Sequence, residues 1–533
     1  MRTTLITALV VGACLAGATS AGAAAGELTY TGCVADNAAA GCVDLPSDPF
    51  QQASAVALSP DGRSVYVTGI AGNSITHLFR DPATGALAFD GCLNDTGSQE
   101  CRDLPESPLF FASDVAVSPN GRSVYVAAFG ARAIAHFFRA PGGQLFYDGC
   151  LANDASDGCI DLPGSPLEGA TAVAVSPDGK FVYVGGSAVA IFSTAGPEGQ
   201  IGYNGCLNND GSDSCVDLPG EPLEGVNDVA VSPDGKSVYA ASFTGDSIGV
   251  LLRRGDTGKL DWDGCLNNDG SDNCANLPGS PIDAALGVAV SRDGRSVYVA
   301  SAVSDSISHF GRDPASGRLS WGSCLNNEGT DTCVDVPGAP LDRAADVAVS
   351  PDGRSVYVAA YDGDAVAQLV RDPRDGRLRW AGCLADTDAE GCVDVPSAPL
   401  NGADAITVSP DGRSVFVGSL FSSALAHFSR ARFVPGKPKL PVAHPDTTAP
   451  AISRVKVSGR RRITLRYTLS EPATVKVVFC RKACRAQRRS ARAGVNRLRT
   501  KLRRGSYRAR LVATDAAGNR SARATVRFRV RRR

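Results

Sequence analysis

The stretch SPDGRSVYV at residues 59–67 decides the fold, because it recurs seven times along the chain. Its first four residues are typical of a tight turn, since proline presets φ and glycine accepts a positive φ. The alternation after the turn is typical of a half-buried strand. The other copies begin at Ser118, Ser176, Ser232, Ser291, Ser350 and Ser409. Copies about 59 residues apart predict a repeat architecture.

Each repeat unit resolves into four short segments that read as strands. In the fifth unit these segments are residues 286–290, 296–300, 306–310 and 318–322. Apolar and polar residues alternate within them, and turn residues separate them, which indicates antiparallel strands. Each unit is therefore expected to form one four-stranded blade.

The two ends of the repeat array indicate how it closes. Residues 27–33 match a fourth strand that lacks its first three, and residues 405–430 contain three strands without a fourth. A ring satisfies both ends and leaves no open sheet edge. The sequence therefore predicts an all-β, seven-bladed β-propeller over residues 27–432, closed by its N-terminal strand.

The repeat also resembles a known family. SPDGRSVYV, an Ile-x-His-Phe third strand and a Thr-Gly-x-Leu turn are similar to the YVTN-type propellers of the lactonase (6-phosphogluconolactonase-like) family. The resemblance spans about residues 27–432. It implies the seven-bladed fold and, as an activity, hydrolysis of a small sugar lactone. No site residue of that family can be matched to a position in this chain.

The first 25 residues and the cysteines indicate the compartment. Residues 1–25 combine a basic start, a short apolar core and small residues, as a secretory signal peptide does. Sixteen cysteines then remain, and an even number in an exported chain predicts disulfides rather than zinc sites. The expected pairs are Cys33/Cys42, Cys92/Cys101, Cys150/Cys159, Cys206/Cys215, Cys265/Cys274, Cys324/Cys333, Cys383/Cys392 and Cys480/Cys484. We expect a secreted or cell-envelope protein without a transmembrane segment.

A second, smaller domain is expected after the repeats. Residues 433–449 are proline-rich and are predicted to be a linker. Residues 450–533 resemble a bacterial immunoglobulin-like module and are expected to form a small β-sandwich. Its predicted strands are residues 452–457, 463–469, 475–479, 506–514 and 524–530.

Charge is divided unequally between the two predicted domains. The formal net charge is −1, but residues 451–533 contain 27 Lys and Arg against two acids. The rest of the chain holds 27 basic and 53 acidic residues. Arginine forms bidentate contacts with phosphate and carboxylate. We expect the basic domain to bind an anionic envelope polymer or, alternatively, an acidic surface of the propeller. Nucleic acid is not expected, because no recognition motif or aromatic interleaving accompanies the charge.

Acidic and amide residues recur inside the cysteine loops, as in the segment Asn209-Asp210-Gly211-Ser212-Asp213. The simplest interpretation is that they form Asx turns. The alternative is a calcium site, although the closing glutamate of a calcium-binding hand is missing. No cofactor is therefore expected, with a divalent cation such as calcium as the alternative.

Candidate site residues are expected at the mouth of the central channel. The candidate catalytic carboxylates are Asp114, Asp228 and Asp346, and the candidate binding residues are Phe129, Phe243, Tyr361, Asn227 and Asp404. Such a set could hold a cation or a sugar; the alternative is hydrogen bonding between blades and packing. His77, His136, His309 and His427 share one third-strand position, and this periodicity indicates packing or blade-edge hydrogen bonds rather than catalysis.

We therefore expect an exported surface or envelope propeller that binds a ligand or partner through its loop-rich face without catalysis. The first alternative is a lactonase-like hydrolase of a small sugar lactone or related ester, with one of the three carboxylates as base or metal ligand. The second alternative is a structural spacer without a small ligand.

Overall fold

The computed structural model describes residues 26–431 and 450–530, except for short gaps at 47, 99, 156–157, 331, 387–390, 460–461, 471–472, 482–483, 493 and 515–520. The chain divides into two compact units at residue 434. The predicted signal peptide, residues 1–25, and the predicted linker, residues 433–449, lie outside the described residues. No described helix is long and apolar enough to cross a membrane.

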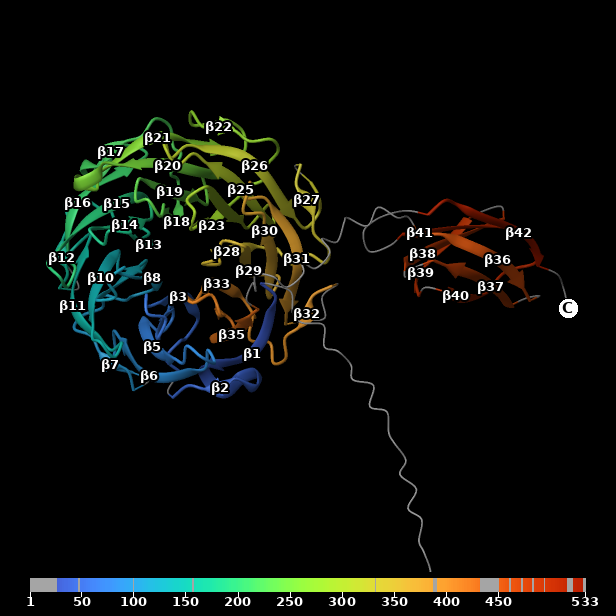
Figure 1. The fold of residues 1–533 in the computed structure, drawn as a ribbon, viewed down its shortest axis with the longest axis horizontal. Coiled ribbons are helices and arrows are strands. Elements are labelled where there is room, and N and C mark those ends of the chain that lie inside the picture. The colour runs from blue at the N-terminus through green and yellow to red at the C-terminus, as the bar shows by residue number, and fades with distance from the viewer. Residues whose placement is uncertain are drawn as a thin grey trace, which may run out of the picture. The chain divides into compact units, whose positions relative to one another are not determined.

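The first unit is a ring of seven sheets, each with five strands, arranged around a common axis (Figure 1). The innermost strands are β3 (Ala53–Leu58), β8 (Ala112–Val117), β13 (Ala172–Val175), β18 (Val226–Val231), β23 (Ala285–Val290), β28 (Ala344–Val349) and β33 (Ala403–Val408). The second strands are β4 (Ser64–Gly69), β9 (Ser123–Ala128), β14 (Phe181–Gly185), β19 (Ser237–Ser242), β24 (Ser296–Ser301), β29 (Ser355–Ala360) and β34 (Ser414–Ser419). We number the blades 1 to 7 in the order of these strands. The fold confirms the predicted seven-bladed propeller.

The third and fourth strands complete the predicted part of each blade. The third strands are β5 (Ser74–Arg80), β10 (Ala133–Arg139), β15 (Ala188–Ala195), β20 (Ser247–Arg253), β25 (Ser306–Arg312), β30 (Ala365–Arg371) and β35 (Ala424–Arg430). The fourth strands are β6 (Leu87–Asn94), β11 (Leu145–Ala152), β16 (Gln200–Asn208), β21 (Leu260–Asn267), β26 (Leu319–Asn326), β31 (Leu378–Ala385) and, for blade 7, β1 (Leu28–Ala35).

A fifth strand of two residues lies outside the fourth in every blade, so the prediction of four strands per blade was wrong. These strands are β7 (Arg102–Asp103), β12 (Ile160–Asp161), β17 (Val216–Asp217), β22 (Ala275–Asn276), β27 (Val334–Asp335), β32 (Val393–Asp394) and β2 (Val43–Asp44). In blade 5 the Cys324–Cys333 disulfide joins β26 to the residue before β27, with the two Cα atoms 4.6 Å apart. The cross-linked loop thereby brings β27 alongside β26 as a parallel strand.

The seven predicted disulfides of the propeller are all formed. They join Cys33–Cys42, Cys92–Cys101, Cys150–Cys159, Cys206–Cys215, Cys265–Cys274, Cys324–Cys333 and Cys383–Cys392. Three short 3-10 helices lie in loops of this unit: η1 (Asp36–Gly41), η2 (Ser212–Ser214) and η3 (Gly255–Thr257). Seven disulfides indicate an oxidising compartment.

The N-terminal strand closes the ring as predicted. Strand β1 pairs antiparallel with β35, so that Leu28 lies opposite Arg430 and Tyr30 opposite Phe428. The rings of Tyr30 and Phe428 meet edge to face at 5.7 Å. The N–H of Gly26 donates to the carbonyl of Ala431. The first described residues therefore complete blade 7.

A repeated hydrogen-bond network joins neighbouring blades on the side of the SPDG turns. In blade 5, Arg312 reaches back to blade 4, where its Nη2 lies 3.0 Å from Asp234 Oδ1 and its Nε donates to Tyr239 Oη at 2.6 Å. Tyr239 Oη then donates to the carbonyl of Gly317. The guanidinium is buried, while Asp234 keeps 30% of its side chain exposed. Equivalent ion pairs are Arg80–Asp411, Arg139–Asp61, Arg253–Asp178, Arg371–Asp293 and Arg430–Asp352.

The contact between blades 2 and 3 lacks this ion pair. Thr194 stands in blade 3 where the other blades have arginine, and Asn120 stands in blade 2 where they have aspartate. Thr194 Oγ1 donates instead to the carbonyl of Gly179 at 2.7 Å. Because both partners are replaced together, neither charge is left unpaired.

Blade 7 carries Phe416 where the other six blades have tyrosine, and this exception yields a prediction. Arg80 lies over the Phe416 ring, 6.0 Å from its centroid, and its buried Nε has no partner in the described chain. The change Phe416→Tyr would supply the missing acceptor. We expect it to stabilise the protein by about 1 kcal/mol, measured by urea unfolding. The matched control, Tyr239→Phe, removes the same contact and is expected to destabilise by a similar amount.

The second unit contains two sheets that enclose a small apolar core. One has strands β36 (Ile452–Ser458), β37 (Arg462–Leu469) and β40 (Gly494–Lys501); the other has β39 (Cys484–Ala491), β38 (Ala473–Cys480), β41 (Gly505–Thr514) and β42 (Ala524–Val530). Leu465, Val477 and Leu511 are among the buried residues of the core. Five strands were predicted and the described residues of this unit form seven, because β39 and β40 were missed. Cys480 is disulfide-bonded, while the side chain of its predicted partner Cys484 lies outside the described residues.

Candidate functional site

The three candidate carboxylates lie on alternate inner strands and link each of these strands to the next blade. Asp228 Oδ1 accepts a hydrogen bond from the N–H of Val229, and its Oδ2 accepts one from the N–H of Val288 in blade 5, both at 2.7 Å. Asp114 bridges in the same way to Val173, and Asp346 to Ile406. Each carboxylate therefore accepts hydrogen bonds from two backbone N–H groups, one in its own strand and one in the next blade.

Burial disfavours the ionised forms of the three carboxyl groups. Burial raises the pKa of Asp114 to about 6 and that of Asp346 to about 7. Burial, followed by the charges of Asp346 and Asp114, raises the pKa of Asp228 well above its usual value. The three groups therefore influence one another, but no group of three metal-ligating side chains is placed to hold an ion within the described chain. Their contacts favour a structural role; the predicted role as base or metal ligand stays a prediction.

The raised pKa of Asp346 predicts how stability depends on pH. Because the folded chain disfavours the ionised carboxyl, the contribution of this group is fully present below about pH 4 and is lost as pH rises through about 7. We expect Asp346→Asn to lower stability at pH 4.5, since the amide accepts only one of the two N–H bonds. When the pH rises from 4.5 to 7.5, the free energy of unfolding should fall less in the variant than in the parent, by roughly 2 kcal/mol or more.

Urea unfolding at both pH values measures this difference. The control is Asp313→Asn in an exposed turn, where the N–H of Ala315 and the hydroxyl of Ser316 lower the pKa of the carboxyl. This control should not flatten the pH profile. A parallel pH profile for Asp346→Asn and the parent protein would contradict the prediction.

Three of the five predicted binding residues line one cavity. Phe129, Asn227 and Phe243 border a cavity of about 320 Å³ above blade 3. The two phenylalanine rings come from blades 2 and 4 and are 49% and 42% exposed. The other lining residues are Glu168, Gly169, Thr171, Gly186, Ser187, Gly225, Val226 and Thr244. We call this cavity the blade-3 recess.

A shortened loop in blade 3 creates the recess. In blade 2, residues 129–132 connect the second and third strands, whereas Gly186 and Ser187 alone connect β14 and β15 in blade 3. Blade 3 therefore has no side chain at the position of Phe129 and Phe243, and the space between those two rings stays open. The shorter loop is visible in the sequence as a shorter repeat, because the third and fourth copies of the SPDG turn begin only 56 residues apart, at Ser176 and Ser232. The spacing of about 59 residues assumed for every repeat concealed it.

The polar groups of the recess are held by neighbouring backbone. Thr171 Oγ1 donates to the carbonyl of Val226 at 2.8 Å, and Asn227 Nδ2 donates to the carbonyl of Leu286 at 3.2 Å. The second contact orients the Asn227 amide and leaves its Oδ1 as an acceptor. At the rim, Glu168 forms an exposed ion pair with Arg132 at 3.0 Å. The recess thus combines two aromatic surfaces with a few oriented polar groups.

The other two predicted binding residues belong to a separate cluster. Arg343 lies over the ring of Tyr361, 4.3 Å from its centroid, and Tyr361 meets Phe421 edge to face at 5.3 Å. Burial raises the pKa of Asp404 to about 7, although the charge of Arg343 opposes the rise. Arg343 and Phe421 are not among the site residues predicted from the sequence. Phe421 lies one position beyond the aromatic column, after Leu420, so alignment of the repeats hides it.

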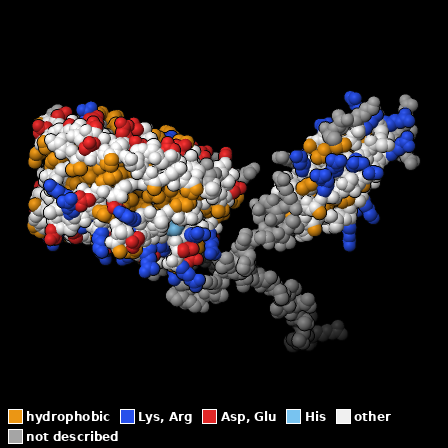
Figure 2. Space-filling view, turned by 90° about the horizontal axis from the view of Figure 1, so that it is seen from above, with side chains coloured by type: hydrophobic (Ala, Val, Ile, Leu, Met, Phe, Trp, Pro, Cys, Tyr) orange, Lys and Arg blue, Asp and Glu red, His pale blue; other side chains and the backbone are white. Residues whose placement is uncertain are grey.

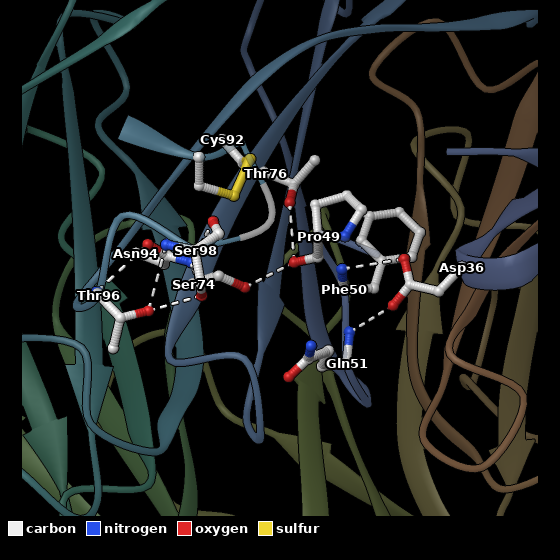
Figure 3. Close-up of a disulfide and its surroundings, with 11 residues drawn as sticks. Asp36, Pro49, Phe50, Gln51, Ser74, Thr76, Cys92, Asn94, Thr96 and Ser98 are labelled. Carbon is white, nitrogen blue, oxygen red and sulfur yellow. Dashed lines mark hydrogen bonds between the residues drawn. A yellow bond between two sulfur atoms is a disulfide. The ribbon is translucent and has the colours of Figure 1, made fainter. Parts of the chain in front are cut away.

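Some acidic residues of the cysteine loops form the expected Asx turns, since Asp210 Oδ1 accepts from the N–H of Ser212 at 2.9 Å and Asp269 Oδ1 from that of Ser271 at 2.8 Å. Others cap more distant backbone groups. Figure 3 shows Asp36, whose carboxylate accepts from the N–H groups of Phe50 and Gln51 at 3.1 and 2.6 Å. In the loop closed by Cys92, Asn94 Nδ2 donates to the carbonyl of Ser98 at 3.0 Å (Figure 3). These side chains serve as local acceptors and donors that shape the loops.

The periodic histidines are buried beside second-strand aromatics. His77 and His136 each bind an aspartate through Nδ1, Asp90 at 2.9 Å and Asp148 at 3.0 Å. His427 stacks on Phe416, with the ring centroids 4.8 Å apart. Burial lowers the pKa of His427, as it does that of His309, to about 4. These contacts confirm the expectation of packing and blade-edge hydrogen bonding.

Together, these observations define the first unit as a disulfide-bonded seven-bladed β-propeller with a recess on the face of the second-to-third strand loops. Its repeats are lactonase-like: the model of the family "Lactonase, 7-bladed beta-propeller" matches residues 212–336. The match spans blades 4 and 5 and confirms the resemblance of the propeller to the lactonase-like propellers. No curated protein matches the chain.

Several solved structures are similar to the chain at low sequence identity. The periplasmic gluconolactonase PpgL of Pseudomonas aeruginosa is 20% identical over 65% of this chain and 87% of its own, with a TM-score of 0.44. Hydrazine synthase of Kuenenia stuttgartiensis is 15% identical over 73% and 98%, with a TM-score of 0.46. The Cps50 (Swd1) β-propeller domain of Myceliophteria thermophila is 10% identical over 76% and 99%, with a TM-score of 0.48.

Proposed function

We propose that this is an exported protein whose propeller binds a neutral, sugar-like ring in the blade-3 recess without chemical conversion. The observation that carries the proposal is the pair of half-exposed rings, Phe129 and Phe243, on either side of a cavity of about 320 Å³. That volume suits one small ring compound. The predicted signal peptide and the seven disulfides support export.

The chemistry of the recess favours a ring with apolar faces and polar edges. Aromatic side chains offer flat apolar surfaces against which the C–H face of a sugar ring can pack. Asn227 and Thr244 lie on the lining beside these surfaces and can bind hydroxyl groups. The one charged lining residue, Glu168, is already paired with Arg132 at the rim. A neutral ligand therefore suits the recess better than an anion.

The alternative function is hydrolysis of a small sugar lactone, which the family match to residues 212–336 favours. Hydrolysis needs a group that activates water. Since Asp114, Asp228 and Asp346 each bind two backbone N–H groups, a hydrolytic site in the recess would draw its carboxylate from Glu168. Faster opening of glucono-δ-lactone than in buffer, lost in Glu168→Gln, would establish the enzyme and overturn the non-enzymatic proposal.

Calorimetric titration of the full chain with glucose, glucono-δ-lactone and gluconate tests the proposed site. We expect the neutral compounds to bind more tightly than gluconate, and Phe243→Ala to weaken the tighter binding about tenfold. The matched control is Phe421→Ala, which removes an exposed aromatic residue from the separate cluster and should change affinity less than about twofold. Equal losses in the two variants, or no binding at roughly 10 mM, would contradict the proposal.

We further propose that the second unit retains the protein on an anionic polymer of the cell envelope. Support comes from its 27 Lys and Arg against two acids in residues 451–533 and from the spread of basic side chains over the visible face of this unit (Figure 2). Sedimentation of the full chain with purified envelope material tests this retention. Binding that persists at low salt and is released by high salt is expected; a chain that stays in solution at low salt would contradict it.

A further inference from the structure

Basic residues lie directly opposite one another on the outer face of the sheet β36-β37-β40. Lys456 is the cross-strand partner of Arg466, and Arg466 is that of Arg497. Arg499 and Lys501 continue the outward-facing positions along β40 beyond the buried Leu498. All five basic residues are exposed. We call Lys456, Arg466, Arg497, Arg499 and Lys501 the cationic face.

This arrangement costs stability within the unit itself. Side chains directly opposite in an antiparallel pair have Cβ atoms about 5 Å apart, and like charges there repel. The described residues of this unit include no acidic side chain. The other sheet repeats the pattern, with Arg508 opposite Arg527. Because these pairs have no acidic neighbour among the described residues, we infer that the compensating charge comes from a bound partner.

We propose that the cationic face binds a linear polyol-phosphate polymer, an inference that rests on the proposed envelope retention and names the chemistry of the polymer. A phosphodiester presents its charged oxygens in different directions, so two opposed guanidinium groups can contact one phosphate. A carboxylate holds both oxygens in one plane and suits a single arginine fork. Rows of opposed basic residues on three strands therefore match a chain of phosphates better than a chain of carboxylates.

The aromatic residues of the unit argue against nucleic acid as the partner. Tyr467 and Phe479 are buried in the core. Tyr507 and Phe528 stack on each other, with ring centroids 5.7 Å apart, and pack against that core. None of these rings is among the exposed residues of the unit, so the cationic face has no aromatic platform for bases. A phosphate polymer without bases is the partner that this surface fits.

The experiment measures binding of the full chain to three polymers of matched charge: poly(glycerol phosphate), polygalacturonate and single-stranded poly-dT. We expect poly(glycerol phosphate) to bind at least about tenfold more tightly than polygalacturonate, with a strong dependence on salt. Equal affinity for the polycarboxylate would overturn the inference. Tighter binding of poly-dT than of poly(glycerol phosphate) would overturn it too, by assigning the face to nucleic acid.

Two triple variants separate the cationic face from net charge. Arg466→Gln/Arg497→Gln/Arg499→Gln removes three charges from the face, whereas Arg503→Gln/Arg504→Gln/Arg523→Gln removes three exposed charges outside the strands. The first should weaken binding of poly(glycerol phosphate) about tenfold or more and lower the salt slope by about 2 to 3, and the second should weaken it much less. Because repulsion is relieved, the first variant should also melt no lower than the parent.

The outcomes distinguish this inference from the proposal on which it rests. Equal losses of affinity for poly(glycerol phosphate) in the two triple variants would overturn the inference that the cationic face is the binding site. The proposal of retention by net charge would remain. If the full chain fails to sediment with envelope material yet binds poly(glycerol phosphate) as described, retention fails and the surface chemistry stands. A lower melting temperature in the first variant would show that its lost binding reflects damage to the unit and would contradict the predicted repulsion.

Discussion

Reduction of all seven propeller disulfides is expected to lower the melting temperature of the first unit by roughly 20 °C. Each disulfide joins residues nine positions apart. Closure of a loop of that length restricts the unfolded chain by about 2–3 kcal/mol. Reduction would also release the fifth strand of each blade, because the cross-linked loop holds it beside the fourth. Scanning calorimetry with and without a phosphine reductant measures the shift.

A variant that lacks one disulfide tests the same mechanism at a single loop. We expect Cys92→Ser/Cys101→Ser to cost about 2–3 kcal/mol, because the other loop contacts, such as that of Asn94 with Ser98, remain. The oxidised parent scanned at the same rate is the reference. A melting temperature that does not move on full reduction, with thiol titration confirming that all seven bonds are open, would contradict the stabilising role.

The second large effect is expected when one arginine of the inter-blade network is removed. Arg312→Ala should destabilise the propeller by about 3 kcal/mol or more. The change leaves the carboxylate of Asp234 without its charged partner. It also removes the N–H group that donates a hydrogen bond to Tyr239 Oη. The network then no longer ties blade 5 to blade 4. Urea unfolding followed by tryptophan fluorescence measures the loss.

The contact between blades 2 and 3 provides the matched control. Thr194→Ala removes the side chain at the equivalent position of blade 3, which within the described chain donates one hydrogen bond, to the carbonyl of Gly179. This change should cost about 1 kcal/mol. The double change Asn120→Asp/Thr194→Arg should restore the ion pair found between the other blades. If Arg312→Ala costs no more than Thr194→Ala, the network does not hold the blades together.

Much of the propeller could be predicted because its determinants are local and repeated. A Pro-Asp-Gly turn followed by alternating residues specifies the same hairpin wherever it occurs, and the cysteine pairs close loops of one length. The matching ends, residues 27–33 and 405–430, then leave one way to complete the last sheet. The same reasoning missed β39 and β40, because their arginine-rich sequences lack the alternation of large apolar residues that marks a strand.

The candidate site was predictable only in part, because its contacts join residues from different blades. Phe129, Phe243 and Tyr361 form one column in the aligned repeats, but only the first two border the recess. The short connection at Gly186 and Ser187 opens space only between blades 2 and 4, which flank blade 3. Tyr361 belongs to blade 6 and therefore does not border this space.

Local sequence establishes the turns and the first four strands of each blade, since these depend on residues near one another in the repeat. The matching ends of the array establish the closed ring. The roles of Asp114, Asp228 and Asp346 depend on packing between blades. Only the assembled ring brings the N–H groups of Val173, Val288 and Ile406 to their carboxylates. Hydrogen bonds across 59 or 60 residues of chain leave no local pattern, so folding in three dimensions makes these acids links between strands.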